Sequence, residues 1–392
     1  MLPGIGIFGT GNIVKIIVPY LKQKGFKVEA IWSRTLSKAE EIAKELEIPY
    51  YTNKIDNVLL RKDVDLIFIL CSPNIQAQIA VKALGIGKHV VCDKPAGLCQ
   101  NEALKMVHAA QYYPSLISII NHSLRFLPAF IYMKQAISEG YIGFKNDITV
   151  CDIRVQMETL YLNQYNWLCD RTMGGGILTL VGSHVIDLIS FLINQKAVRV
   201  HGIIKTFQRT SANINGIRHI TSPDFCSFQM EMSGNTLVTV TLNSHMTSIY
   251  NQEVLICGKD GHLIVKGSDL YGFEKKSGKE EVLYMDVKNL NKWKKLNPSI
   301  GNIIPKPYIR GFFKMIGSLK EAFLPVEDKS GWVKEPVADA STFEDGLYVQ
   351  AVIDALYKSS SKREWIRVNM ITEEPDPNPL LSAAVRKTGI SF

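Results

Sequence analysis

Residues 4–18 read GIGIFGTGNIVKIIV, and this stretch decides how the first part of the chain folds. It joins a short apolar run, a turn that contains Gly9 and Gly11, and a run whose apolar residues recur at helical spacing. A strand that passes through a glycine-rich turn into a helix is typical of a Rossmann dinucleotide-binding unit. In such a unit Gly9 makes the tight turn, and Gly11 lets the backbone approach a pyrophosphate at the helix N-terminus.

The same alternation of short apolar runs and amphipathic stretches continues to about Pro95. The runs VDLIFIL (64–70) and HVVC (89–92) are apolar at successive positions, as in parallel strands that are covered on both faces. Amphipathic stretches such as LSKAEEIAKEL (36–46) lie between the strands and predict helices. We therefore expect an α/β domain over residues 1–125, with a doubly wound parallel sheet.

From about Asp147 the pattern changes to strands with period-two alternation, such as ITVCDIRVQM (148–157) and DFCSFQMEMS (224–233), joined by short polar turns. This pattern predicts an α+β domain over residues 126–368, built on an open and mostly antiparallel sheet. The last residues, 369–392, are rich in Pro, Glu and Asn and predict an irregular tail. A chain of 392 residues exceeds the roughly 250–300 residues that one core usually holds, which also favours two domains.

Composition argues against several classes of protein. The net charge of +8 comes from dispersed Lys and Arg without a basic helix, so we expect no nucleic-acid partner. The seven cysteines include no Cys-x-x-Cys pair, which argues against a disulfide framework and a zinc site and favours a reducing, cytoplasmic location. We expect no signal peptide and, because no uninterrupted apolar run approaches about 18 residues, no membrane span.

The turn after the first strand also indicates the cofactor. Thr10, Asn12 and Ile13 complete the turn around Gly9 and Gly11, although Val14 stands where a third small residue is usual. At the end of the second strand, an NAD-preferring site carries an acidic residue, whereas this chain has Ser33 followed by Arg34, with Lys38 nearby. These residues suit a 2′-phosphate and predict NADP in preference to NAD. The alternative is that Arg34 is an ordinary solvated surface residue.

Four strings follow in a fixed order: SPN (72–74), GKHVVCDKP (87–95), NHSLRFLP (121–128) and GGGILTLVGSHVIDL (174–188). Together with the glycine turn, they resemble the Gfo/Idh/MocA family of sugar and polyol oxidoreductases, and within it the animal glucose-fructose oxidoreductase domain-containing proteins. The resemblance implies a nicotinamide cofactor, a small sugar-like substrate, and a homodimer formed through the open sheet of the second domain.

The resemblance also implies roles for individual residues. Lys94, preceded by Asp93 where the family has Glu, takes the place of the family lysine that assists proton transfer beside the nicotinamide. His184 takes the place of the second catalytic residue, but Leu180 stands where active relatives carry aspartate. The residues implied to line the cofactor cleft after the fourth strand are Cys71, Ser72, Pro73 and Asn74. Gln76 or Ala77 occupies the position of a family histidine.

Aromatic residues before the triple glycine are candidates for a sugar platform. Tyr161, Tyr165 and Trp167 offer ring faces, and Arg125 offers donors for hydroxyls or a carboxylate. The alternative for the aromatic residues is plain core packing.

Two functional hypotheses remain open at this stage. In the first, the protein is an NADP-dependent oxidoreductase with weakened catalysis, in which Lys94 and His184 handle the proton and no metal takes part. In the second, motivated by Leu180, it is an inactive relative that holds NADP(H) as a structural or sensing ligand.

Overall fold

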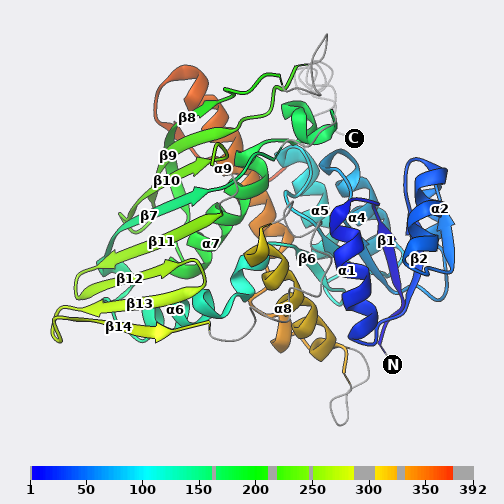
Figure 1. The fold of residues 1–392 in the computed structure, drawn as a ribbon, viewed down its shortest axis with the longest axis horizontal. Helices are drawn as coiled ribbons and strands as arrows, with labels where there is room; N and C mark the ends of the chain where they lie inside the picture. Colours follow the sequence, from blue (N-terminus) through cyan, green and yellow to red (C-terminus); the bar gives the residue numbers. More distant parts are fainter. Residues whose placement is uncertain are drawn as a thin grey trace, which may run out of the picture.

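The computed structural model describes residues 2–160, 165–210, 219–246, 250–286, 305–324 and 332–373. It contains two sheets with helices packed between and around them: a parallel sheet formed by the first part of the chain and a larger sheet formed by the second (Figure 1). Most of the predicted tail, residues 374–392, lies outside the described residues, and residues 369–373 form no helix or strand.

The first sheet confirms the predicted Rossmann topology. Its six strands are all parallel and follow the order β3-β2-β1-β4-β5-β6. The central strands β1 and β4 are buried at every position, which explains why their sequences are apolar without alternation. The strands are β1 (Ile5–Phe8), β2 (Val28–Trp32), β3 (Tyr50–Thr52), β4 (Leu66–Ile69), β5 (His89–Cys92) and β6 (Ser118–Ile120). The helices are α1 (Asn12–Gln23), α2 (Leu36–Glu45), α3 (Ile55–Leu59), α4 (Gln76–Gly85) and α5 (Gln100–Tyr112).

The second sheet has nine strands and is mostly antiparallel, as predicted. One pair differs, because β7 and β10 run parallel in the middle of the sheet. The chain leaves β7, passes through a helix and the β8–β9 hairpin, and returns beside β7 in the same direction. The strands, in sheet order, are β14 (Lys279–Tyr284), β13 (Asp269–Glu274), β12 (Gly261–Lys266), β11 (Asn251–Gly258), β7 (Ile148–Gln156), β10 (Leu237–Asn243), β9 (Phe225–Met232), β8 (Ala197–Lys205) and β15 (Ile366–Arg367).

Among the described residues, helices cover one face of this sheet. The helices α6 (Pro128–Ser138), α7 (Ser183–Ile193) and α9 (Phe343–Lys362) share one apolar core with the inward side chains of the strands (Figure 1). Along β9 and β10, buried and half-buried residues alternate strictly. This alternation confirms the period-two prediction and leaves the opposite face of the sheet open.

Helix α8 (Lys306–Ala322) packs against the first domain although it comes late in the chain. Phe312 and Phe313 lie in the same apolar core as residues of β1, β4 and α1. The Phe313 ring stacks on Tyr20 with ring centroids 3.8 Å apart, and Phe312 packs 6.3 Å from Phe68. The boundary at residue 125 stays a prediction, but the first core draws residues from well beyond it.

One helical run, Arg171–Ile193, is long and apolar enough to cross a membrane by length and composition alone. The polar residues His184 and Asp187 lie within this run. Because they interrupt its apolar residues, the run was not identified from the sequence. In the structure, 89% of its most apolar window is buried inside the protein, where α7 lies beneath the large sheet. Such burial is typical of the core helix of a globular domain.

Candidate active site

The glycine turn lies at the carboxyl end of β1, where helix α1 begins. Gly9 has φ +133°, and a Cβ at this position would come 2.5 Å from the carbonyl oxygen of Leu70. A Cβ on Gly11, in contrast, would meet no atom within 4 Å. The structure therefore requires glycine at residue 9 for backbone packing, whereas Gly11 faces open space at the N-terminus of α1.

The end of β2 lies beside this turn. The Ser33 hydroxyl is buried and lies 3.4 Å from the Thr10 hydroxyl. Arg34 and Lys38 are exposed. Arg34 is nevertheless close enough to the end of β4 for its charge to act on Cys71, although burial dominates there and raises the pKa of that thiol to about 12. The structure thus brings Thr10, Ser33 and Arg34 to one edge of the parallel sheet.

The segment after β4 is held by its own hydrogen bonds. The buried Ser72 hydroxyl donates to the Asn74 side chain at 2.7 Å, and Pro73 begins a short 3-10 turn. Gln76 is fully buried, and its amide donates to the Cys71 carbonyl and accepts from the Gly97 backbone N–H. Gln76, one of the two candidates for the position of the family histidine, therefore ties the two loops that follow β4 and β5 to each other.

Lys94 follows β5 at the same edge. Its backbone N–H donates to Asp93 Oδ1 at 3.0 Å, and its ammonium lies 4.0 Å from Asp93 Oδ2. Asn121 donates to the same Asp93 oxygen at 3.1 Å. The Lys94 side chain is 17% exposed, so its charge is partly desolvated and has Asp93 as its ion-pair partner.

His184 lies on the first turn of α7 and is completely buried, 2% exposed. Its ring packs 4.6 Å from the ring of Tyr308 and 5.6 Å from that of His122. Burial lowers the pKa of His184 well below its ordinary value, and the charge of Lys94 lowers it further. The imidazole is therefore neutral at neutral pH, and the two residues predicted to be catalytic, Lys94 and His184, lie within reach of each other's charge.

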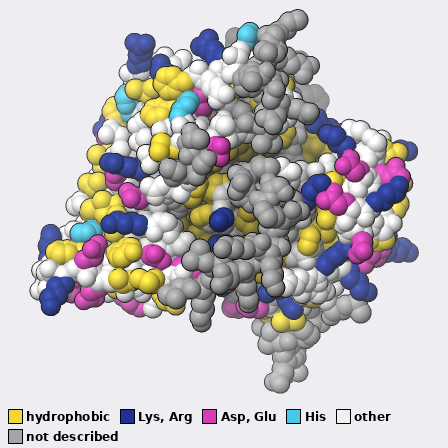
Figure 2. Space-filling view, in the orientation of Figure 1, with side chains coloured by type: hydrophobic (Ala, Val, Ile, Leu, Met, Phe, Trp, Pro, Cys, Tyr) yellow, Lys and Arg dark blue, Asp and Glu magenta, His cyan; other side chains and the backbone are white. Residues whose placement is uncertain are grey.

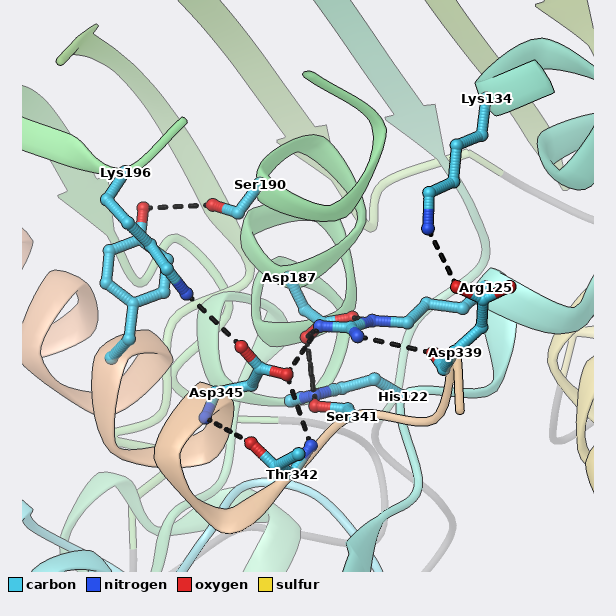
Figure 3. Close-up of polar contacts among 11 residues, drawn as sticks. His122, Arg125, Lys134, Asp187, Ser190, Lys196, Asp339, Ser341, Thr342 and Asp345 are labelled. Atoms are coloured by element: carbon cyan, nitrogen blue, oxygen red, sulfur yellow. Dashed lines mark hydrogen bonds and ion pairs between the residues drawn. The ribbon is translucent and has the colours of Figure 1, made fainter. Parts of the chain in front are cut away.

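Asp187, one helical turn after His184, joins three parts of the chain (Figure 3). It accepts two hydrogen bonds from Arg125, at 2.7 and 2.6 Å, and lies 3.2 Å from His122 Nδ1. The Ser341 hydroxyl donates to the same carboxylate at 3.0 Å. Burial alone would raise the pKa of Asp187, but His122 and Arg125 hold it well below its usual value, so the carboxylate is ionised.

The expectation that Arg125 binds substrate does not fit these contacts. Arg125 is 7% exposed, and besides Asp187 its guanidinium donates to the Asp345 carboxylate at 3.0 Å and to the Asp339 carbonyl at 3.3 Å. Four of its five N–H groups are thus used within the protein. Arg125 links the end of the first domain to α7 and to the start of α9. The sequence did not predict this role, because it does not show that two distant carboxylates converge on Arg125.

The predicted aromatic platform is only partly described. Tyr161 lies outside the described residues. Tyr165 packs against Cys169 and Ile220 in a small apolar cluster, which favours the packing alternative for this residue. Trp167 is half-buried in the turn that follows, and its role in substrate binding stays a prediction. Leu180 is half-buried in a π-helical turn, Leu178–Gly182, directly before α7.

His122 and Tyr308 are the site residues that sequence analysis did not single out. His122 lies inside the NHSLRFLP string, so the string pointed to the right segment but not to the residue. Tyr308 comes from α8, which could be placed beside His184 only once the fold was known. Among the described residues, no group of His, Cys, Asp and Glu side chains has the arrangement of a metal site.

Comparison with known proteins agrees with this geometry. Residues 4–120 match the model of the oxidoreductase family with an NAD-binding Rossmann fold, and residues 130–264 match the GFO/IDH/MocA C-terminal domain. The chain belongs to the Gfo/Idh/MocA oxidoreductase family. Within the family, it is 46% identical to glucose-fructose oxidoreductase domain-containing protein 1 of Xenopus tropicalis, with both chains covered completely.

Solved structures share the fold of this family member. A levoglucosan dehydrogenase in complex with NADH and L-sorbose has a TM-score of 0.76 at 18% identity, with 94% of this chain and 99% of that chain covered. A super-repressor mutant of Gal80p from Saccharomyces cerevisiae has a TM-score of 0.73, also at 18% identity, with 94% and 98% covered. The same fold therefore occurs in a dehydrogenase and in a protein whose mutant is called a super-repressor. The fold alone does not decide between the two functional hypotheses.

Proposed function

We propose that this protein is an NADP-dependent oxidoreductase that acts on a hydroxyl or carbonyl group of a sugar or polyol. The observation that carries the proposal is the meeting of Lys94 and His184 at the carboxyl edge of the parallel sheet. In an open parallel sheet, ligands bind outside this edge, at the point where the strand order reverses. Here the order reverses between β1 and β4, which end at Phe8 and Ile69, shortly before Gly9 and Cys71.

The glycine turn fits a dinucleotide. Gly11 is the N-cap residue of α1 and has no side chain, so the first N–H groups of the helix face the open space beside it. Backbone N–H groups at a helix N-terminus form a favourable site for a pyrophosphate. Gly9, Thr10, Gly11, Asn12 and Ile13 would hold the phosphates, and the segment Cys71–Asn74 and the pair Asp93–Lys94 would line the nicotinamide end.

A preference for NADP is supported by the end of β2. Ser33 and Arg34 occupy the corner where an acidic residue would contact a ribose 2′-hydroxyl, and Lys38 adds a second cation on α2. The N-cap residue Thr35 makes no side-chain capping hydrogen bond in the described structure, so backbone donors at the start of α2 are open to a phosphate as well.

Arg34→Ala is expected to weaken NADPH binding about tenfold or more, the loss of at least one hydrogen bond between charged groups. NADH affinity is expected to stay unchanged, because the ribose 2′-hydroxyl carries no charge. Titration of both nucleotides by fluorescence or calorimetry measures the ratio. Lys44→Ala, at the far end of α2, is the matched control. Equal losses for both nucleotides, or recovery of NAD alone from the purified protein, would contradict the NADP assignment.

The chemistry follows from the partly exposed Lys94 and the buried His184. When bound, an oxidised nicotinamide supplies the acceptor for the hydride of the alcohol carbon. The Lys94 ammonium stabilises negative charge on the substrate oxygen as the proton leaves. His184, which is neutral because it is buried, has a ring nitrogen available to accept that proton.

Lys94→Ala tests this role. We expect turnover with the best sugar or polyol substrate to fall by about a hundredfold or more, the usual loss when one group that stabilises charge in the transition state is removed. Nucleotide affinity should change far less than turnover, because the phosphates would be held by the glycine turn and not by Lys94. The assay follows absorbance at 340 nm over a panel of sugars and polyols, and Lys105→Ala, an exposed lysine on α5, serves as the control. Full turnover by Lys94→Ala would remove the lysine from the mechanism.

The inactive alternative is favoured by one observation, the half-buried Leu180 at the position of the family aspartate. On this alternative the protein keeps NADP(H) as a structural or sensing ligand. The same assay separates the two functions, since the alternative requires that the unmodified protein be inactive on the whole panel and retain its nucleotide through purification. Robust turnover by the unmodified protein would exclude it.

We also infer a homodimer formed through the open face of the nine-stranded sheet. The outward residues of β8 and β7 include the exposed Val198, Ile203 and Val150, which give this face apolar surface that the helices do not cover.

In Figure 2, basic and acidic side chains of the described residues are interspersed on the face shown and form no continuous basic stripe, which agrees with a small-molecule ligand in preference to nucleic acid. The seven free thiols support a cytoplasmic location.

A further inference from the structure

His122 occupies a position that is unusual for a residue without an assigned role. It is 1% exposed and lies between Asp187 and His184. Its Nδ1 lies 2.9 Å from the Ser341 hydroxyl and 3.2 Å from the Asp187 carboxylate. Its other ring nitrogen, Nε2, is buried and has no hydrogen-bond partner among the described residues.

The contacts at Nδ1 decide which nitrogen of His122 carries the proton. The Ser341 hydroxyl donates its hydrogen to Asp187, so its oxygen is left to accept from His122. The Asp187 carboxylate is ionised and can only accept. Both neighbours of Nδ1 are therefore acceptors, so Nδ1 is protonated. If the ring carries this one hydrogen, Nε2 holds a lone pair, and that nitrogen is buried without a hydrogen-bond partner among the described residues.

The matching donor lies on His184. His184 Nδ1 is also buried without a hydrogen-bond partner among the described residues. The two rings are 5.6 Å apart, centre to centre, with an interplanar angle of 75°. Two orphaned nitrogens on neighbouring buried rings are costly unless they pair, directly or through one bound water. Pairing requires the hydrogen on His184 Nδ1, because His122 Nε2 is the acceptor.

We propose that His122 is a positioning residue, and that it replaces the aspartate lost at Leu180 by connecting His184 to the carboxylate of Asp187. The chain of hydrogen bonds runs from His184 Nδ1–H to His122 Nε2, and from His122 Nδ1–H to Asp187 and Ser341. In a neutral His184 ring it leaves the lone pair on Nε2. This inference rests on the proposed function for its catalytic consequence but not for its hydrogen bonds.

The proton transfer balances without another reactant. In the proposed reaction the substrate hydroxyl would give its proton to His184 Nε2, and the O–H electron pair would form the carbonyl, with a bound oxidised nicotinamide as the acceptor of the hydride from the same carbon. His184 then carries a positive charge, which Asp187 offsets through His122.

The charged and titratable groups that face His184 are Lys94 after β5, His122 before the turn Ser123–Phe126, Asp187 on α7 and Tyr308 on α8. Burial raises the pKa of Tyr308 to about 12, so its hydroxyl stays neutral.

Two substitutions separate the functions of the two ring nitrogens. In His122→Asn, the side-chain amide takes the place of Nδ1 and keeps the contact with Asp187 and Ser341, but no acceptor reaches His184. In His122→Gln, the amide takes the place of Nε2, and its oxygen accepts from His184 Nδ1–H. Thermal unfolding checks that both variants fold, and nucleotide titration checks that their cofactor site is intact.

The first readout is independent of activity. With ¹⁵N-labelled histidine, two-bond nitrogen–proton correlation spectra of the full-length protein report the tautomer of His184. We expect the Nδ1–H tautomer in the unmodified protein and in His122→Gln, and loss of that preference in His122→Asn. An Nε2–H tautomer in the unmodified protein, or an unchanged His184 in His122→Asn, would overturn the proposal.

The second readout is the pH profile of turnover. We expect the kcat of His122→Asn to fall by roughly 10- to 100-fold at unchanged KM, with its acidic limb moved to lower pH, because protonated His184 loses its acceptor. His122→Gln should recover most of the rate. If the unmodified protein is inactive on the whole panel, the proposed function fails, and the tautomer still decides the hydrogen-bond chain. If His122→Asn keeps the full rate, the positioning role fails while the proposed function stands.

Discussion

Replacing Asp187 by alanine is expected to lower the free energy of unfolding by about 3–5 kcal/mol, the usual cost of removing one partner of a buried ion pair. The variant leaves the Arg125 guanidinium, which is 7% exposed, with Asp345 as its one remaining ion-pair partner in the described part of the chain. It also takes away the acceptor that His122 and Ser341 share. The loss is large because these groups are too deeply buried for water to replace the carboxylate.

Chemical denaturation at neutral pH measures this change. Asp339→Ala is the matched control, since that carboxylate is 62% exposed and pairs with Lys134 at the surface, where such pairs contribute about 0–1 kcal/mol. Because the pKa of Asp187 is lowered in the folded protein, its contribution is present above the unfolded value of about 3.9 and is lost as the pH falls. The difference between the two proteins should therefore shrink in acid. A loss equal to that of the control would contradict the buried network.

Phe312→Ala is expected to cost about 3–5 kcal/mol, the range measured for truncating a large aromatic side chain in a core. Phe312 is 1% exposed and packs on Phe68 of β4, so its removal opens a cavity between α8 and the parallel sheet. The expected consequence is loosening of the nucleotide-binding domain, although the residue lies almost 190 positions after the predicted boundary at residue 125.

The same denaturation experiment tests this prediction, with Phe144→Ala as the control, because the Phe144 ring is 77% exposed. Surface substitutions of this kind usually change stability by less than about 0.5 kcal/mol. Nucleotide binding should weaken in Phe312→Ala in parallel with the stability of the first domain. If Phe312→Ala lowered the free energy of unfolding as little as Phe144→Ala does, the packing of α8 on the parallel sheet would contribute little to stability.

The regular parts of the fold were predictable from the sequence. Residues 4–18 and the continuous apolar runs of β4 and β5 predicted a parallel sheet, because strands covered on both faces carry no polar alternation. The alternation in β9 and β10 likewise predicted a sheet covered on one face. The parallel pairing of β7 with β10 was not predictable, since neighbouring order in a sheet depends on the return path of the chain.

The site was predictable to the level of segments. The strings containing Lys94 and His184 do meet, but the roles of Arg125 and His122 depend on contacts between residues far apart in the chain. Arg125 pairs with Asp187 and Asp345, which lie 62 and 220 positions away. One local signal was available, because His184 and Asp187 are three residues apart on a helix and so lie on one face. That spacing placed a carboxylate near the imidazole but gave no indication of the second ring between them.

The packing of α8 against the parallel sheet also has a consequence for synthesis on the ribosome. Protein domains generally fold as units, the N-terminal one first, while the chain is still being made. Here the sheet strands are complete by Ile120, but the helix that covers part of their core begins only at Lys306. Until that helix emerges, the apolar surface beneath Phe312 stays uncovered. The nucleotide-binding half is therefore the first to begin folding and among the last to be finished.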